Sequence, residues 1–435
     1  MSRVSNVQTS RIQNYIDFRK DTLSFFEKML YQGEIISLKT GFKPSYIVNS
    51  PDFVKEILVA KDRFFVKGRT SKVLRRTIGD GLLTSEKEEH EIQKKHLQPL
   101  FYKESIHSYV QTIKEETQLL EAKLQENHTY SIQNEMMQLT LSIISKTMFA
   151  TDLEESKQEL AIAVSEIIEQ SAKDLFSIVI LPLSVPTQGN KLHKSAIKKL
   201  EEMIYRVIVD AKNKPNLYQN TLVNIFLGKG YEKTFSDEEI RDQMLTMLLA
   251  GHETTANLLT WIFYELDRNP EVEAQFHNEI DQVDFSKDPF DTYRALPYTQ
   301  NIIQEGLRLY PPAWLIYREA PQKVELLGET FRPGSSFMIS PYAIHRNEYV
   351  FKDAKSFKPE RFFGNPTWPA FAYFPFGGGS RSCIGSKFAL MEAAFILAVL
   401  GKRYKFRSVS QEKAIPEPLV SLRLRGGLPM RAIRR

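Results

Sequence analysis

The sequence contains a single cysteine among its 435 residues. One cysteine cannot form a disulfide within the chain, so a reducing, cytoplasmic setting is expected. A membrane-spanning helix needs about 18 or more consecutive apolar residues. The longest apolar runs, Phe388 to Leu400 and Leu175 to Pro186, are shorter and are interrupted by Glu392 and Pro182. The sequence therefore predicts no membrane span, and it leaves open whether the second run touches a bilayer.

The chain also lacks a strong charge of either sign. Its 58 Lys and Arg residues against 53 Asp and Glu residues give a net charge of +5, without a long basic block. Nucleic acid is therefore not an expected partner. Nothing at the N-terminus has the charged, apolar and small-residue pattern of a secretion signal. The 42% of hydrophobic and 26% of charged residues are typical of a folded globular protein with a large core.

Periodicity indicates a mostly helical chain. Two short β-type runs, Glu34 to Leu38 and Tyr46 to Val48, precede a helix that opens near Pro51. From about Lys87 to Asp281, apolar residues recur at the three and four spacing of helices. We expect a mainly α fold with a minor β portion, as one domain over 1–435. Its strand-rich part lies at about 20–70, its helical part at about 85–315, and its remaining strands with the cysteine at about 316–435.

The cysteine lies in a glycine-rich stretch, Phe376 to Gly385, directly before an apolar helical segment. Glycines allow backbone conformations that are closed to other residues and let the chain approach a flat ligand. The start of a helix stabilises a thiolate, which is a good ligand for iron and for softer metals. A lone cysteine taken without its context is more often a small buried hydrophobe.

The pattern F-x-x-G-x-R-x-C-x-G favours a metal-binding cysteine over a buried hydrophobe, because the probability that it appears by chance in a chain of this length is about one in ten thousand. Here the sequence resembles the cytochrome P450 family, whose cysteine-loop signature it matches at Phe376, Gly379, Arg381, Cys383 and Gly385. The resemblance implies haem b (iron protoporphyrin IX), with Cys383 as the iron ligand. It also implies that Arg381 pairs with a haem propionate and that Phe376 packs beside the thiolate.

Two upstream segments have the same order as in the family. Glu305 and Arg308 are three residues apart on one predicted helical face, and Arg361 follows in the segment Pro359 to Phe362. An E-x-x-R match alone is expected about once by chance in a chain of this size, and a surface pair is then the simpler interpretation. The resemblance implies instead a buried structural ion network near the haem.

Ala250 to Thr255 interrupt an apolar helix predicted from about Asp237 to Asn269. A glycine and two threonines are poor choices for a helix interior, and a hydroxyl can widen a helix locally. The resemblance implies that Glu253 and Thr254 relay protons to bound dioxygen, whereas a kinked core helix is the alternative. His252 is expected to pack beside them and not to bind metal.

Further cofactor contacts follow from the resemblance alone. It places Arg318 against a haem propionate, and it places the stretch from Gly79 onward before a helix that contacts the cofactor. That helix departs from the usual form, because His90 stands where the family usually has tryptophan and Lys94 stands for its basic partner. Both side chains can donate a hydrogen bond to a carboxylate.

The resemblance therefore implies a monooxygenase that inserts one oxygen atom from dioxygen into a lipophilic small molecule, by hydroxylation or epoxidation. Electrons are expected from a separate ferredoxin or flavodoxin with its reductase. A peroxide-driven fatty-acid peroxygenase and a non-catalytic haem sensor or carrier are the alternatives. Lys43, in the turn Thr40 to Pro44, is at the position where one fatty-acid-hydroxylating branch has a basic residue, although a solvated lysine is the simpler interpretation. The positions expected to line the substrate pocket are mostly apolar: Leu82, Leu83, Met247, Ala250, Ala313, Trp314, Leu315 and Val420.

Overall fold

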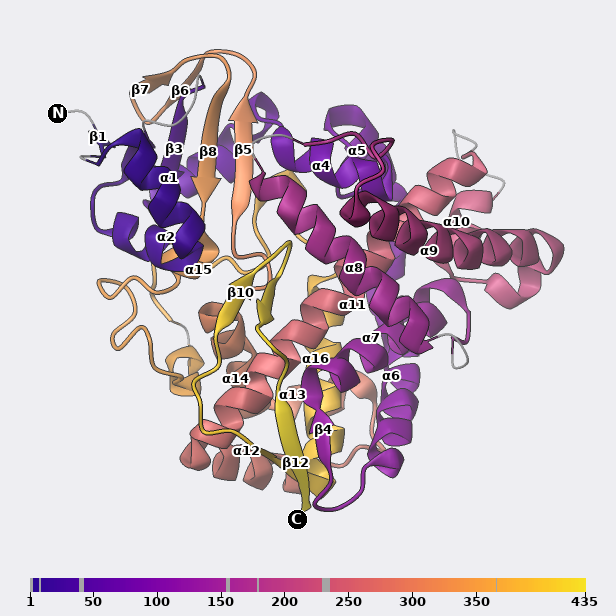
Figure 1. Ribbon diagram of the computed structural model, residues 1–435. Helices are drawn as coiled ribbons and strands as arrows, with labels where there is room; N and C mark the ends of the chain where they lie inside the picture. The colour runs from indigo at the N-terminus through magenta and orange to yellow at the C-terminus, as the bar shows by residue number, and fades with distance from the viewer. Residues whose placement is uncertain are drawn as a thin grey trace. The chain divides into compact units, whose positions relative to one another are not determined.

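A computed structural model describes residues 3–7, 9–38, 43–153, 157–177, 180–228, 235–364 and 366–435 (Figure 1). It is mainly helical with small sheets, which confirms the predicted fold class. The chain divides into two compact units. Unit 1 comprises Met1–Thr70 and Gln304–Cys383, and unit 2 comprises Ser71–Ile303 and Ile384–Arg435.

Unit 1 contains a five-stranded sheet, in which β3, β8 and β5 lie side by side (Figure 1). The two runs expected as strands form an antiparallel pair, β2 and β3, with Ile36 opposite Ile47. β3 then pairs in parallel with β8. In sheet order the strands are β1 (Val4–Asn6), β2 (Ile35–Leu38), β3 (Ser45–Val48), β8 (Ser335–Ile339) and β5 (Ile316–Ala320). The turn proposed for Lys43 lies partly outside the described residues, at 40–42.

Short helices and one hairpin complete unit 1. Pro51 begins α3 at the position where a missing N–H costs nothing, as the sequence predicted, and a π-helical turn follows. Phe53 and Ile57 from this segment are fully buried in the same apolar cluster as Phe337 of β8. The elements are α1 (Arg11–Lys20), α2 (Thr22–Leu30), α3 (Pro51–Lys55), η1 (Glu56–Ala60), η2 (Asp62–Phe64), β6 (Val324–Leu326), β7 (Glu329–Phe331), α15 (Pro341–Ile344), η5 (Pro359–Phe362) and η6 (Gly379–Arg381).

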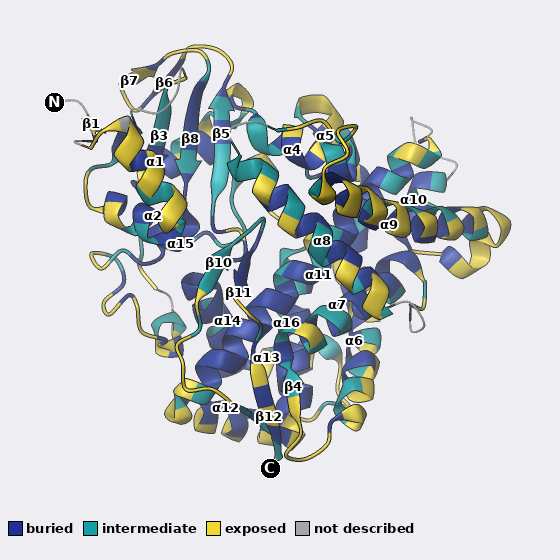
Figure 2. Ribbon diagram, viewed as in Figure 1, coloured by how far each residue is buried: buried dark blue, intermediate teal, exposed yellow. Residues whose placement is uncertain are grey.

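Unit 2 is built around α11 (Asp237–Arg268), which is buried along most of its length (Figure 2). Ser236 and Glu239 cap its start reciprocally, and Pro270 begins the next helix two residues after its end. α11 packs against α7, α9, α12 and α16. The helices of unit 2 are α5 (Lys87–Leu97), η3 (Gln98–Phe101), α6 (Lys103–Lys123), α7 (Ile132–Phe149), α8 (Lys157–Phe176), α9 (Gln188–Asn213), η4 (Pro215–Tyr218), α10 (Leu222–Leu227), α12 (Pro270–Gln282), α13 (Pro289–Arg294) and α16 (Ser386–Arg403). Two helices cross the boundary between the units: α4 (Arg69–Ile78) and α14 (Pro297–Leu309).

Two small sheets belong to unit 2. β12 (Pro429–Arg434) lies between β4 (Thr129–Ser131) and β9 (Tyr404–Ser408), and β10 (Pro416–Pro418) forms a hairpin with β11 (Leu422–Leu424). No helix in the described part of the chain is long and apolar enough to cross a membrane. The apolar run from Leu175 includes residues 178 and 179, which lie outside that part.

The structure brings Glu305, Arg308 and Arg361 together in unit 1. The Glu305 and Arg308 side chains are both 0% exposed, with Arg308 Nε 2.7 Å from Glu305 Oε2. Arg361 Nε donates to Glu305 Oε1 at 3.2 Å, and Arg308 Nη1 donates to the Ala354 carbonyl at 2.6 Å. Because each charged group has partners, burial of the charges is tolerated, and the network joins the end of α14 to the segment that follows α15.

Replacing Glu305 by Gln should lower the free energy of unfolding by about 3–5 kcal/mol, because Arg308 would keep a buried charge without its counter-charge. Urea titration of the purified variant measures this change. The matched control is Asp291→Asn, which breaks an ion pair of the same i,i+3 spacing between side chains that are 59% and 68% exposed. That substitution should change the stability by less than about 1 kcal/mol. Equal losses of stability in the two variants would contradict the view that a buried ion pair is costlier to break than an exposed one.

Candidate active site

The cysteine loop of unit 1 uses glycines where the backbone requires them. Gly377 and Gly379 have φ of +70° and +67°, the left-handed region that other residues rarely adopt. A Cβ atom on Gly379 would also lie 1.8 Å from the Leu58 carbonyl oxygen, so that position cannot carry a side chain. The Cys383 N–H donates to the Phe376 carbonyl at 2.9 Å, which closes the loop. The Cys383 side chain is exposed.

The chemistry of this loop fits a haem. No group of three His, Cys, Asp or Glu residues that could hold a metal ion occurs among the residues that the structure describes. A thiolate at Cys383 can supply one ligand to iron, and a porphyrin brings four nitrogen ligands of its own. A single exposed thiolate is therefore a sufficient protein donor set for this cofactor.

The arginines expected at the haem propionates both lie in unit 1. Arg381 ends the 3-10 turn η6 and is half-buried. Arg318 lies on β5, is 7% exposed and donates from Nη1 to the Tyr317 carbonyl at 3.0 Å. His90 and Lys94 belong to unit 2, where they lie one turn apart on α5. His90 is buried and Lys94 is half-buried, and their contact with the cofactor stays a prediction.

One short stretch of α11 is open in an otherwise buried helix. From Asp242 to Leu266, only Leu249, Ala250, Gly251 and Thr254 are not buried, and Ala250 is exposed. Ala250 and Thr254 are one turn apart and so share a face of the helix. An exposed face in the middle of a core helix is a place where a small molecule can reach the backbone.

The local widening expected of α11 is not found. The segment is α-helical from Asp237 to Arg268, and the Thr254 hydroxyl donates to the Ala250 carbonyl at 2.9 Å. Gly251 has a packing role, because a Cβ atom there would lie 3.0 Å from Ile144 Cδ1 of α7. The glycine thus lets α7 approach α11 closely.

The neighbours of Thr254 are buried and turned away from this open face. His252 is 1% exposed, and its Nδ1 lies 2.6 Å from the Leu248 carbonyl. Burial lowers the pKa of His252, which favours the neutral packed residue that the sequence suggested. Glu253 is 2% exposed and binds Arg423, with 2.6 Å between Oε1 and Nε.

Two segments bring apolar side chains of unit 2 to α11. The Leu82 N–H donates to Gln243 Oε1 of α11 at 3.0 Å. Gln243 is one helical turn before Met247, so Leu82 is held near that residue. Leu83, the next residue, is half-buried. Val420 lies at the tip of the β10–β11 hairpin beside Ser421, whose Oγ is 2.8 Å from Asn257 Nδ2 of α11. Leu82, Met247 and Val420 thus come from different segments tied to the same helix.

The remaining pocket candidates lie in unit 1, between α14 and β5. Trp314 is 2% exposed, and its ring meets Phe26 edge-on with 6.3 Å between centroids. Its carbonyl accepts a hydrogen bond from Ser340 Oγ at 2.9 Å. Ala313 is exposed and Leu315 is half-buried, so Trp314 anchors a segment whose two flanking side chains are accessible.

Sequence reasoning missed two charged residues close to α11. Arg423 stands between two leucines in β11, and a charge in so short an apolar strand was the available signal of a buried partner. Glu392 of α16 was noted only as an interruption of an apolar run. It is 1% exposed, and burial raises its pKa to about 8, against the effect of a hydrogen bond from Thr255.

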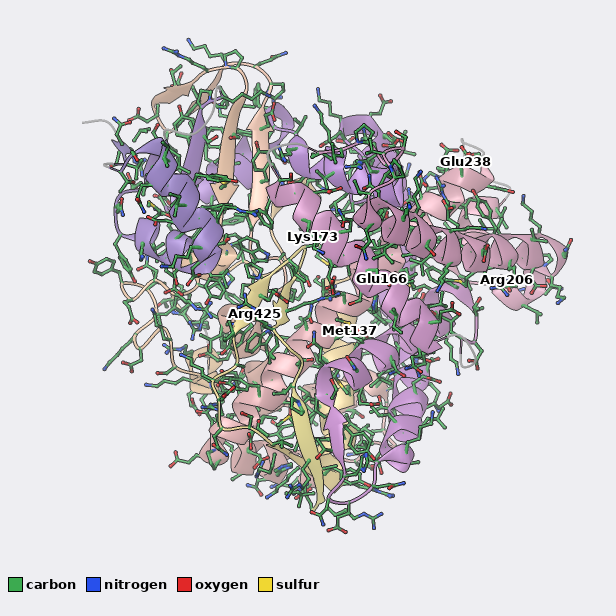
Figure 3. The ribbon with its side chains drawn as sticks, viewed as in Figure 1. Met137, Glu166, Lys173, Arg206, Glu238 and Arg425 are labelled. Carbon is green, nitrogen blue, oxygen red and sulfur yellow. The ribbon has the colours of Figure 1, made fainter. Side chains whose placement is uncertain are left out.

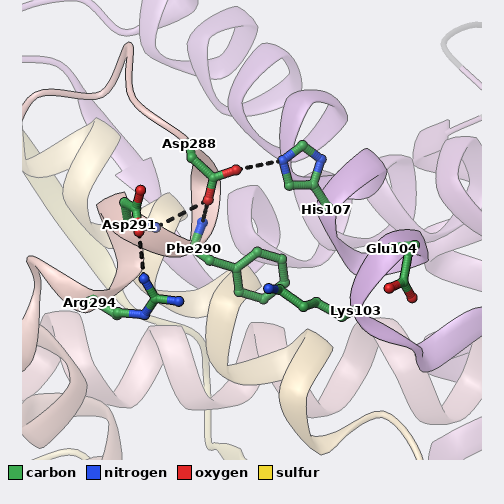
Figure 4. Close-up of a pocket in the computed structure, with 7 residues that line it drawn as sticks. All are labelled: Lys103, Glu104, His107, Asp288, Phe290, Asp291 and Arg294. Carbon is green, nitrogen blue, oxygen red and sulfur yellow. Dashed lines mark hydrogen bonds and ion pairs between the residues drawn. The ribbon is translucent and has the colours of Figure 1, made fainter.

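A separate pocket lies on the surface of unit 2 and contains none of the expected site residues (Figure 4). Two ion pairs line it: His107 Nε2 lies 2.9 Å from Asp288 Oδ2, and Arg294 pairs with Asp291. The lining residues are Lys103, Glu104, His107, Asp288, Phe290, Asp291 and Arg294. Because this pocket holds neither the cysteine loop nor the open stretch of α11, it is not the candidate active site.

Comparison with known proteins agrees with this geometry. The family model described as Cytochrome P450 matches residues 11–428. The chain is 32% identical to "Cyclooctatin synthase" of Streptomyces melanosporofaciens, over 92% of this chain and 89% of the relative. It is 30% identical to "Cyclooctat-9-en-7-ol 5-monooxygenase" of the same organism, over 89% and 85%. It is also 30% identical to "Pentalenene oxygenase" of Streptomyces avermitilis, over 88% and 86%. The chain therefore belongs to the cytochrome P450 family of haem-thiolate monooxygenases, which take electrons from redox partners.

Proposed function

We propose that this P450 monooxygenase oxygenates a cyclic terpene at the open face of α11, with Cys383 as the iron ligand. The observation that carries the proposal is the accessible stretch at Ala250 and Thr254 in a helix that is otherwise buried. Apolar side chains from the Leu82 loop and from the hairpin tip are tied to the same helix. The names of three relatives describe oxygenation of such compounds or their formation.

Each candidate residue has a role that its chemistry allows. Bound haem supplies the activation of dioxygen and the transfer of one oxygen atom to the substrate. Cys383 would hold the iron, while Arg318 and Arg381 would offer cations to the two propionates, with His90 and Lys94 as further donors. The Thr254 hydroxyl, on the open face, would hold water and pass protons that come through Glu253.

The structure offers less support for a fatty acid as substrate. Lys43 Nζ lies 2.9 Å from Glu319 Oε1, so the lysine already has a carboxylate partner. A fatty-acid carboxylate would have to compete with Glu319 for this exposed lysine. The presence of both Glu253 and Thr254 also argues against a peroxide-driven enzyme, which needs no proton relay, and against a non-catalytic haem carrier.

For the redox partner, we propose a small acidic ferredoxin or flavodoxin. Lys95 and Lys387 are exposed, so these basic groups of unit 2 can meet an acidic surface. Arg346 of unit 1 is 6% exposed, and its guanidinium lies 3.6 Å from the centroid of the Tyr342 ring. Arg346 is therefore not part of this surface.

A protein that needs its one cysteine as a thiolate fits the reducing cytoplasm.

Replacing Cys383 by His should abolish the thiolate-type spectrum of the reduced carbon monoxide complex, because the chain has no other cysteine. Absorption spectra of the purified variant, with the haem content measured in parallel, test the assignment. If the variant retains the thiolate-type spectrum, another group binds the iron.

Replacing Thr254 by Ala should lower the ratio of product to consumed nicotinamide by about tenfold, because proton delivery then fails and electrons are lost to peroxide. Haem content should stay unchanged. Thr260→Ala is the matched control, since its hydroxyl makes the same kind of bond, to the Ala256 carbonyl at 2.7 Å, but is buried. Similar coupling in the two variants would show that Thr254 has no special part in the relay.

A cyclic terpene hydrocarbon such as pentalenene should produce a low-to-high spin shift at lower concentration than a long-chain fatty acid does. The parent should also not distinguish a fatty acid from its methyl ester, and Lys43→Ala should change neither affinity by more than about tenfold. Spectral titration of parent and variant measures these affinities. A preference for the acid that disappears in Lys43→Ala would favour the fatty-acid alternative over the terpene.

A further inference from the structure

Glu253 and Arg423 form a buried ion pair inside unit 2. Their side chains are 3% and 7% exposed, and 2.6 Å separates Glu253 Oε1 from Arg423 Nε. Removing two charges from water is costly, and the cost is offset only if each charge keeps good partners. The carboxylate of the proposed proton relay is therefore held by one specific cation.

Arg423 also reaches α8. Its Nη1 donates to Ser165 Oγ at 2.8 Å and lies 3.9 Å from Glu169 Oε1, whose side chain is 54% exposed. Glu166 and Lys173 are other charged side chains of α8, and Figure 3 labels both. Arg423 thus joins β11, α8 and α11 through one guanidinium.

A second tie keeps the hairpin in register with α11. Asn257 Nδ2 donates to Ser421 Oγ at 2.8 Å. Glu253 and Asn257 are four residues apart on the helix, while Ser421 and Arg423 are two apart in the hairpin, so each pair shares a face. Val420, at the tip of this hairpin, is a candidate pocket residue. The position of the carboxylate is thus linked to an element that we expect beside the substrate.

The ion pair holds Glu253 away from the open face of α11. Successive residues of a helix point about 100° apart, and the Thr254 hydroxyl is bonded to the Ala250 carbonyl. We infer that Arg423 is a positioning residue, which keeps Glu253 as a fixed carboxylate and controls its transfer of protons toward Thr254. One proton enters Glu253 from solvent and one leaves toward Thr254, so the carboxylate is regenerated. The titratable or charged groups that face Glu253 are Arg423 and His252, and Glu169 of α8 lies near the same guanidinium of Arg423.

This inference rests on the proposed role of Glu253 in proton transfer. The test therefore compares Arg423→Gln, Glu253→Gln, the double variant and Arg423→Lys, all as haem-loaded protein with a surrogate ferredoxin and its reductase. Arg423→Gln should lower coupling about fivefold and increase the solvent isotope effect on turnover, because proton delivery becomes slower. Arg423→Lys, which retains the charge, should restore most of the coupling. The double variant should match Glu253→Gln, because Arg423 would act only through the carboxylate.

Ser421→Ala is the matched control, since it removes the other tie of the same hairpin without touching Glu253. It should leave the isotope effect at the parent value, which separates proton positioning from displacement of the hairpin. If Arg423→Gln does not fold, the double variant, which leaves no unpaired buried charge, and Arg423→Lys still decide the matter. Two results overturn the inference. In the first, Arg423→Lys loses as much coupling as Glu253→Gln does. In the second, the double variant loses more coupling than Glu253→Gln alone.

The two proposals fail in different ways. If Glu253→Gln has the coupling of the parent, Glu253 carries no protons, and both the proposed relay and the role of Arg423 are wrong. If Glu253→Gln loses coupling while Arg423→Gln keeps the parent's coupling and isotope effect, only the inference about Arg423 is overturned.

Discussion

The buried guanidinium of Arg308 is the constraint on which unit 1 most depends. Its charge is accommodated because Glu305 takes up two of its nitrogens, at 2.7 and 2.8 Å, and because backbone carbonyls of His345, Ala354 and Ser356 accept the remaining donors. These carbonyls belong to the segment after α15, in which the described residues form no β-strand and only short turns fix the backbone. A single side chain thus organises a stretch of chain that leads toward the cysteine loop.

In unit 2 the same physical rule operates at α11. The helix has charged and polar groups among its buried residues, and the buried carboxylate of Glu253 is held by a cation that comes from a distant part of the sequence. Among the residues that the structure describes, none forms an ion pair with Glu392 of α16, and burial raises its pKa to about 8. Two buried acids near one helix are therefore accommodated differently: Glu253 by an ion pair with Arg423, and Glu392 by a raised pKa, which favours its neutral form.

Much of the fold could be predicted because the signals were local. Pro51 at a helix start, the two β-type runs before it and the helical period through the middle of the chain each depend on neighbours in sequence. The glycine run before Cys383 was equally informative, since positive φ at Gly377 and Gly379 is a local backbone property. The role of Gly251 was not predictable in this way, because it depends on Ile144 of another helix.

The sequence by itself determined the family, the cofactor class and the candidate ligand Cys383, because a single cysteine in a dense motif leaves no other choice of thiolate. It could not determine that Arg423 binds Glu253, that Arg346 is buried against Tyr342 or that Lys43 pairs with Glu319. Arg423 and Glu253 are 170 positions apart in the sequence, and Lys43 and Glu319 are 276 apart. Arg346 and Tyr342 are four apart. Two of the three contacts are set by which elements meet after folding, and the third, although local, depends on burial by the rest of unit 1. Only the tertiary structure decides which charges lose water and must find a partner.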